Sequence, residues 1–220
     1  MSYSWISFDC YGTLIDWHAG IRSALAQVTP ELCPNQIEDI ADSYDQSERA
    51  LEVADYQPYR LILRKALAEA FIHNSLSYPR PADLLVHALP TWRPFPEVPQ
   101  VLQKLKTSGY RLAILSNVDR DLIEPSLAQL PVHFDVVVTA EDVGSYKPDS
   151  RHWEALLARV GVAPSNILHV AAGLYYDIPS AQRMGFSTCW INRHSASPGH
   201  IRPDMTLTNL TGLTDALRII

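Results

Sequence analysis

The sequence predicts an α/β fold in which helices cover a parallel sheet and a second, all-helical lobe is inserted. Three observations predict it. Short apolar segments alternate with segments of helical periodicity from residue 98 onward, and another short apolar segment occupies residues 5–8. Between them, residues 17–93 carry helical patterns and no strand pattern. A doubly wound, Rossmann-like parallel sheet core with an inserted all-helical cap follows.

The first expected strand ends in a single carboxylate. Trp5, Ile6 and Phe8 make a short buried strand, and the Tyr-Gly-Thr sequence at 11–13 supplies a turn. Asp9 should therefore lie at the carboxyl end of a strand, where open α/β sheets bind their ligands. A carboxylate there can act as a covalent nucleophile. An isolated Asp at such a position can instead cap the turn through its own backbone.

The inserted lobe is expected to be helical throughout. Apolar residues follow helical spacing over 35–53 and 58–73. Prolines interrupt the pattern at 79–81 and at 90–99, where TWRPFPEVP has the composition of a linker. A lobe inserted after the first strand can cover the carboxyl edge of the sheet. The resulting domain boundaries are 1–16 and 94–220 for the catalytic core and 17–93 for the helical cap.

Beyond the linker, helices and strands alternate regularly. The expected helices span 98–107, 119–130, 149–160 and 178–184, with a last one from residue 210. The expected strands span 111–115, 136–139, 167–170, 187–191 and 205–207. In a parallel sheet, the loops that follow these strands meet at one edge.

Composition limits the classes of function. The chain has 220 residues, 47% of them hydrophobic, and a formal charge of -6, without the basic patch that a nucleic-acid partner requires. No apolar run approaches the roughly 20 residues that span a bilayer, and no signal-peptide pattern opens the chain, so we expect a cytoplasmic protein. The three cysteines form no CxxC pair, which indicates neither a disulfide framework nor a zinc site.

Polar residues follow four of the expected strands. Besides Asp9 they are Ser116 with Asn117, Lys147 in SYKPD, and Asp177 after ILHVAAGLYY. Each has a structural alternative: Ser116 and Asn117 can cap the next helix, Lys147 can be a surface lysine, and Asp177 can cap the helix that starts at Asp-Ile-Pro. Because a parallel sheet brings these loops together, a shared site is favoured.

Four motifs carry a family resemblance. DCYGTLID, ILSN, SYKPD and LYYDIPSAQRMGFSTCWINR resemble, in order and spacing, the motifs of the haloacid dehalogenase superfamily. The resemblance covers nearly the whole chain and implies that the helical insertion is a cap. Phosphatases of the superfamily have a second Asp two residues after the nucleophile and an acid pair that helps to bind magnesium. Here Tyr11 and the segment 171–173, Ala-Ala-Gly, replace them.

The resemblance therefore points to the L-2-haloacid dehalogenase branch, which needs no metal or other cofactor. It implies that Asp9 attacks a substrate carbon to form an ester, which water then hydrolyses. Lys147 would keep Asp9 ionised, Thr13 would hold one of its oxygens, and Asp177 would position Lys147 or the water. Ser116 and Asn117 would bind the substrate carboxylate. The other residues expected to line the pocket are Tyr11 and Tyr175.

Departures from the branch leave the substrate open. Ser43 stands where dehalogenases have a halide-binding arginine; Arg49 and Arg60 are the nearest substitutes, although either can be an exposed helix charge. Trp153 replaces a tyrosine of the dehalogenases and is a further candidate for substrate contact.

We expect a hydrolase that acts on a small anionic substrate, first of all a 2-halocarboxylate. The sequence is compatible with a homodimer. Alternatives are ring opening of a strained cyclic amino acid, a phosphatase that uses Mg²⁺, and a non-catalytic binding descendant.

Overall fold

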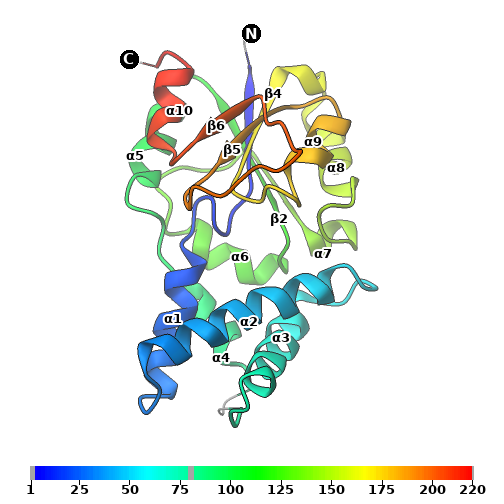
Figure 1. The fold of residues 1–220 in the computed structure, drawn as a ribbon. Coiled ribbons are helices and arrows are strands. Elements are labelled where there is room, and N and C mark those ends of the chain that lie inside the picture. Colours follow the sequence, from blue (N-terminus) through cyan, green and yellow to red (C-terminus); the bar gives the residue numbers. More distant parts are fainter. Residues whose placement is uncertain (1–2, 79–81, 220) are drawn as a thin grey trace.

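The computed structural model describes residues 3–78 and 82–219, and its core is a six-stranded parallel sheet (Figure 1). The strands are β1 (Trp5–Phe8), β2 (Arg111–Ser116), β3 (Val136–Thr139), β4 (Ile167–Ala171), β5 (Ser187–Ile191) and β6 (Met205–Leu207). Their order is β3-β2-β1-β4-β5-β6. The order reverses between β1 and β4, which is where sheets of this type open a crevice for a ligand.

Helices cover both faces of the sheet, as the alternation predicts. One face is covered by α5 (Val98–Thr107) and α10 (Thr211–Ala216), and the other by α7 (Ala140–Val143), α8 (Arg151–Val160) and α9 (Ile178–Arg183) (Figure 1). A 3-10 turn, η2 (Pro164–Asn166), leads into β4, and α6 (Arg120–Leu127) lies near the carboxyl edge. The strands β1 and β4 are buried over their whole length because both of their faces are covered, and Ser7 and His169 are the polar residues in them.

A group of helices lies beyond the carboxyl edge of the sheet. It consists of α1 (Trp17–Val28), α2 (Pro34–Glu52), α3 (Tyr59–His73) and α4 (Leu84–Ala88), which continues into the 3-10 turn η1 (Leu89–Thr91) (Figure 1). The apolar faces of α2 and α3, among them Ile40, Tyr44, Ile62 and Leu63, are buried. Gly20 of α1 lets Trp92 pack against the helix backbone, because a Cβ at this position would meet the indole ring at 2.2 Å.

The core holds this helical group through the segment between α2 and α3. The first turn of α3 has no cap of its own, and Asp119 of the core accepts hydrogen bonds from the backbone N–H groups of Tyr59 and Arg60 at 2.7 and 3.1 Å. The Tyr146 hydroxyl donates a hydrogen bond to the carbonyl of Gln57 at 2.7 Å. A carboxylate from another element thus serves as the helix cap.

The structure confirms the predicted fold class, and each expected strand of the core is present. The helix expected over 119–130 is shorter: it begins after Asp119, continues past Pro125 and ends at Leu127. The sequence predicts α1 and α4 only as parts of the helical region 17–93, and it does not predict α7. The proline interruption at 79–81 lies outside the described residues. In the described ranges, no helix combines the length and apolar character that crossing a membrane requires.

Candidate active site

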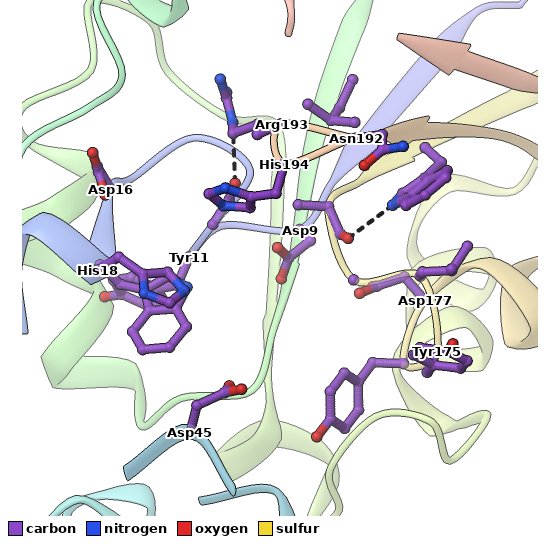
Figure 2. Close-up of a pocket in the computed structure, with 18 of the residues that line it drawn as sticks. Asp9, Tyr11, Asp16, His18, Asp45, Tyr175, Asp177, Asn192, Arg193 and His194 are labelled. Atoms are coloured by element: carbon purple, nitrogen blue, oxygen red, sulfur yellow. Dashed lines mark hydrogen bonds between the residues drawn. The ribbon is translucent and has the colours of Figure 1, made fainter. Parts of the chain in front are cut away.

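A cavity of about 750 Å³ separates the carboxyl edge of the sheet from the helical group. Its core side is formed by residues that follow β1, β2, β4 and β5, and its other side by α1 and α2. Figure 2 shows Asp9 and Asp177 close together at the edge of the sheet, with Asp45 of α2 facing them from the helical side. The structure therefore places these strand-end residues in one cavity, as predicted.

Lys147 joins two carboxylates at the bottom of this cavity. Its Nζ lies 2.8 Å from Asp9 Oδ1 and 2.7 Å from Asp177 Oδ1, and it donates a third hydrogen bond, at 3.1 Å, to the carbonyl of Leu115. The side chains of Lys147 and Asp177 are each 2% exposed. All three donors of the ammonium group are therefore used, and its position relative to Asp9 is fixed.

Burial and charge act in opposite directions on these groups. Burial raises the pKa of Asp9, and the Lys147 charge with the Thr13 hydrogen bond offsets only part of that rise. Burial also raises the pKa of Asp177, but Lys147 and His169 outweigh it and hold the pKa below its usual value. Burial alone would lower the pKa of Lys147; the two carboxylates hold it above its usual value. The ionised form of Asp9 thus depends on Lys147.

Thr13 fixes the second oxygen of Asp9. Its hydroxyl donates a hydrogen bond to Asp9 Oδ2 at 2.7 Å and accepts one from the backbone N–H of Ala172 at 2.8 Å. The turn between them needs Gly12, whose φ of +88° is unfavourable for other residues. Both oxygens of Asp9 are therefore oriented before any ligand binds.

A buried histidine supports Asp177. His169 Nε2 lies 3.0 Å from Asp177 Oδ1, and its Nδ1 lies 2.9 Å from the Ser7 hydroxyl. Ser7 and His169 are register partners on β1 and β4, so the sheet itself aligns them. A polar pair on two adjacent buried strands was the signal in the sequence that could have revealed this contact.

Gly173 allows the Asp177 carboxylate to approach the loop after β4. A Cβ built at this glycine would lie 2.4 Å from Asp177 Oδ2. Any other residue here would displace the carboxylate from Lys147 or distort the loop. This explains in steric terms why a glycine is required at the position.

Ser116 and Asn117 both line the cavity but differ in their contacts. Asn117 accepts a hydrogen bond from the backbone N–H of Lys147 at 2.7 Å and donates to Glu52 Oε2 at 3.1 Å. Ser116 Oγ is buried and has no hydrogen-bond partner among the described residues. Ser116 is thus available to a ligand, whereas Asn117 already joins the core to α2.

Three other predicted substrate contacts also line the cavity. Tyr11 does so with its ring, while its hydroxyl lies 3.1 Å from the hydroxyl of Ser126. Tyr175 is 59% exposed at the margin of the pocket (Figure 2). Arg49 lines the cavity too, but its guanidinium forms an ion pair with Asp45 at 2.7 Å. None of the three has a polar group directed at Asp9 by a hydrogen bond within the described ranges.

Two predicted contacts lie elsewhere, which corrects the sequence-based expectation. Arg60 sits in the first turn of α3, where its guanidinium binds Asp119 and Asp121 of the core, outside the cavity. Trp153 is fully buried on α8, which covers a face of the sheet, and its ring lies 5.6 Å from that of His169. Position along the chain could not reveal that Arg60 pairs with core carboxylates outside the cavity or that Trp153 packs behind the sheet.

The side chains around Asp9 do not fit a magnesium site. Mg²⁺ prefers oxygen ligands in octahedral geometry, and the described residues contain no group of three His, Cys, Asp or Glu side chains arranged to hold a metal. The Lys147 ammonium already lies between the two nearest carboxylates. The donor set is therefore that of a site with a fixed internal cation.

Comparison with known proteins agrees with this geometry. The family model of the haloacid dehalogenase-like hydrolases matches residues 3–185, a range that contains Asp9, Lys147 and Asp177. The chain belongs to this family. Within it, the chain is 34% identical to an (S)-2-haloacid dehalogenase of Pseudomonas sp. (strain YL), over 86% of this chain and 82% of the relative. It is 29% identical to an (S)-2-haloacid dehalogenase of Pseudomonas putida, over 96% and 95%.

A solved structure shows the same family fold. The L-2-haloacid dehalogenase of Xanthobacter autotrophicus, determined with chloropropionic acid covalently bound, superposes with a TM-score of 0.82 at 22% identity. The match covers 98% of each chain. The similarity to the L-2-haloacid dehalogenase branch that the four motifs indicated is thereby confirmed.

Proposed function

We propose that the protein hydrolyses the carbon–halogen bond of a small 2-halocarboxylate through an ester of Asp9, without a metal ion. The observation that carries the proposal is the Lys147 ammonium, 2.8 Å from Asp9 and 2.7 Å from Asp177. A fixed cation there keeps a buried carboxylate ionised and therefore nucleophilic. The names of the relatives, (S)-2-haloacid dehalogenases, support this choice of substrate class.

The reaction proceeds in two steps. A carboxylate oxygen of Asp9 attacks the halogen-bearing carbon, an ester bond forms, and the halide leaves with the electrons of the broken bond. Because a halide departs without a proton, the site needs no general acid for this step. The hydroxyl of Ser116 is available to bind the substrate carboxylate during the attack.

Hydrolysis of the ester restores the nucleophile. Water attacks the carbonyl carbon of the Asp9 ester, and the hydroxy acid is released. Asp177 is the group placed to orient that water, because its lowered pKa keeps it ionised and Lys147 and His169 hold it in position. The oxygen of the attacking water then remains in the Asp9 carboxylate.

Isotope transfer tests this proposal directly. The enzyme is incubated with 2-chloropropionate in heavy-oxygen water with a chelator present, under single-turnover conditions. We expect chloride release and one heavy oxygen in the peptide that contains Asp9, and neither in Asp9→Asn. Absence of both in the wild-type protein would refute the proposal for this substrate. Chelator-sensitive turnover of p-nitrophenyl phosphate would instead support a phosphatase.

A further inference from the structure

The side of α2 that lines the cavity is acidic. Asp45, Glu48 and Glu52 follow one another at i, i+3 and i+7, so they share one face of the helix. Arg49 lines the same cavity and forms an ion pair with Asp45 at 2.7 Å. Neither glutamate takes part in an ion pair within the described ranges. Two carboxyl groups therefore face the cavity without a cation.

Neutral groups hold these two carboxyls in place. Glu48 Oε1 accepts hydrogen bonds from the hydroxyls of Tyr44 and Tyr59 at 2.6 and 2.5 Å. Glu52 Oε2 accepts one from Asn117 at 3.1 Å. Burial raises the pKa of Glu48 to about 7 and the pKa of Glu52 well above its usual value. This is the behaviour of half-buried carboxyls that lack a counter-ion.

An unpaired hydrogen-bond donor on the core side points independently to a ligand in the cavity. Ser116 Oγ, in a residue that is 1% exposed, has no partner among the described residues. Ser116 lines the cavity. Buried polar atoms without a partner are rare in folded proteins, so a bound acceptor such as a carboxylate is their natural complement.

The two sides of the cavity thus differ in charge preference. The Ser116 hydroxyl and Lys147 lie on the core side, and two carboxyls without an ion-pair partner lie on the side of α2. A plain haloacid anion would satisfy the core side only, and its halide or its carboxylate would face the glutamates. A positive group on the ligand would favour the ionised form of both glutamates and attract them.

We propose that the substrate is a small carboxylate that also bears a cationic nitrogen, which Glu48 and Glu52 bind on the cap side of the cavity. The inference rests on the proposed function, since it assumes that Asp9 attacks a carbon of this molecule. An ammonium group can donate a hydrogen bond to each glutamate while the carboxylate end binds at Ser116. The pair of glutamates then determines specificity and takes no part in bond breaking.

The nitrogen can have either of two chemical roles. It can remain on the product while a halide leaves, or it can be the leaving group of a strained ring. In the second case Asp9 attacks the ring carbon, the C–N bond breaks, and its electron pair goes to nitrogen, which stays tethered as an amine. Hydrolysis of the ester then consumes one water: its oxygen stays in the Asp9 carboxylate, one of its protons completes the hydroxyl group of the product, and the other goes to the amine.

A matched pair of substrates tests the inference. The compounds 2-chloropropionate and 3-amino-2-chloropropionate differ only by the ammonium group. We expect the amino compound to have a KM at least about tenfold lower, because a desolvated charge pair contributes more than a solvated one. Glu48→Gln and Glu52→Gln should each raise the KM of the amino compound at least about tenfold, whereas the unsubstituted chloride should keep an unchanged or lower KM. Asp42→Asn, an exposed carboxylate of the same helix, is the control and should change neither.

Product binding keeps this inference separate from the proposed function. Calorimetry on the wild-type protein compares lactate with 3-amino-2-hydroxypropionate, neither of which can react. Equal affinity for the two would overturn the inference, whether or not either chloride is hydrolysed, and equal KM shifts of both substrates in the glutamine variants would do so as well. Chloride release with label in Asp9 would still uphold the proposed function. Opening of azetidine-2-carboxylate by wild-type but not by Asp9→Asn would assign nitrogen the role of leaving group.

Discussion

Replacing Lys147 by Met removes the charge that two buried carboxylates share while keeping most of the side-chain volume. At an effective dielectric constant of about 20, each contact of 2.7–2.8 Å corresponds to a gross attraction of about 6 kcal/mol. Desolvation of the three charges offsets most of it, and removing one partner of such a buried pair costs about 3–5 kcal/mol. We expect the free energy of unfolding to fall by an amount in that range at pH 8.

The pH dependence follows from the pKa shifts. In the wild-type protein the pKa of Asp177 lies below its unfolded value of 3.8, so its contribution to stability is complete above that pH and is lost as the pH falls through the folded pKa. Without Lys147, burial raises the folded pKa of both carboxyls above 3.8. Stability is then lost as the pH rises from 3.8 towards these raised values and stays at its lowest above them, so the defect should be larger at pH 8 than at pH 5.

Urea unfolding of both proteins at pH 5 and pH 8 measures this difference. The control is Lys106→Met, which removes a partly exposed ion pair with Asp135 at 2.6 Å and should cost at most about 1 kcal/mol, equally at both pH values. In parallel, Lys147→Met should hydrolyse 2-chloropropionate at pH 7 with a kcat/KM at least about a hundredfold lower than wild type, because Asp9 becomes protonated. An equal stability loss at pH 5 and pH 8, or a rate within about tenfold of wild type, would refute the reasoning.

Three further substitutions test the supporting contacts. Gly173→Ala should lower kcat at least about tenfold without loss of the circular dichroism spectrum, since the new Cβ would lie 2.4 Å from the Asp177 carboxylate; unchanged kcat would contradict that steric account. Thr13→Val should reduce the free energy of unfolding, measured with urea, by about 1–3 kcal/mol, because the backbone N–H of Ala172 loses the Thr13 hydroxyl as its acceptor; a neutral effect would contradict this. Asp119→Ala should cost about 1–2 kcal/mol and lower the Tm through loss of the α3 cap, and an unchanged Tm would show that the cap is dispensable.

Several features of the site were predictable because they depend on local sequence and on the rules of parallel sheets. Asp9, Ser116 and Lys147 stand directly after apolar segments or in turn sequences, and chain topology alone brings such positions to one edge. The replacement of a second acid by Tyr11 was also visible without a structure. Short-range chemistry and strand order therefore located the nucleophile and its neighbours.

Other features required the packing of distant elements. Arg60 and Trp153 stood at suitable positions in the sequence, yet one binds Asp119 and the other packs behind the sheet. His169 gained its partners Ser7 and Asp177 only through strand register. Side-chain direction depends on the rotation of each helix and on the register between strands, and neither can be read from the spacing of residues along the chain.

The sequence by itself determined the fold class, the succession of strands and most helices along the chain, and the carboxylate that lies at the end of β1. Periodicity and turn chemistry are local properties, so they survive without knowledge of tertiary contacts. Only the tertiary structure decided how the cavity is charged: it placed Lys147 between two carboxylates and turned Glu48 and Glu52 of α2 into the same space. The physical reason is that the strength of an interaction between two charges depends on their burial and on the distance between them. Both arise from the packing of the helical group on the sheet.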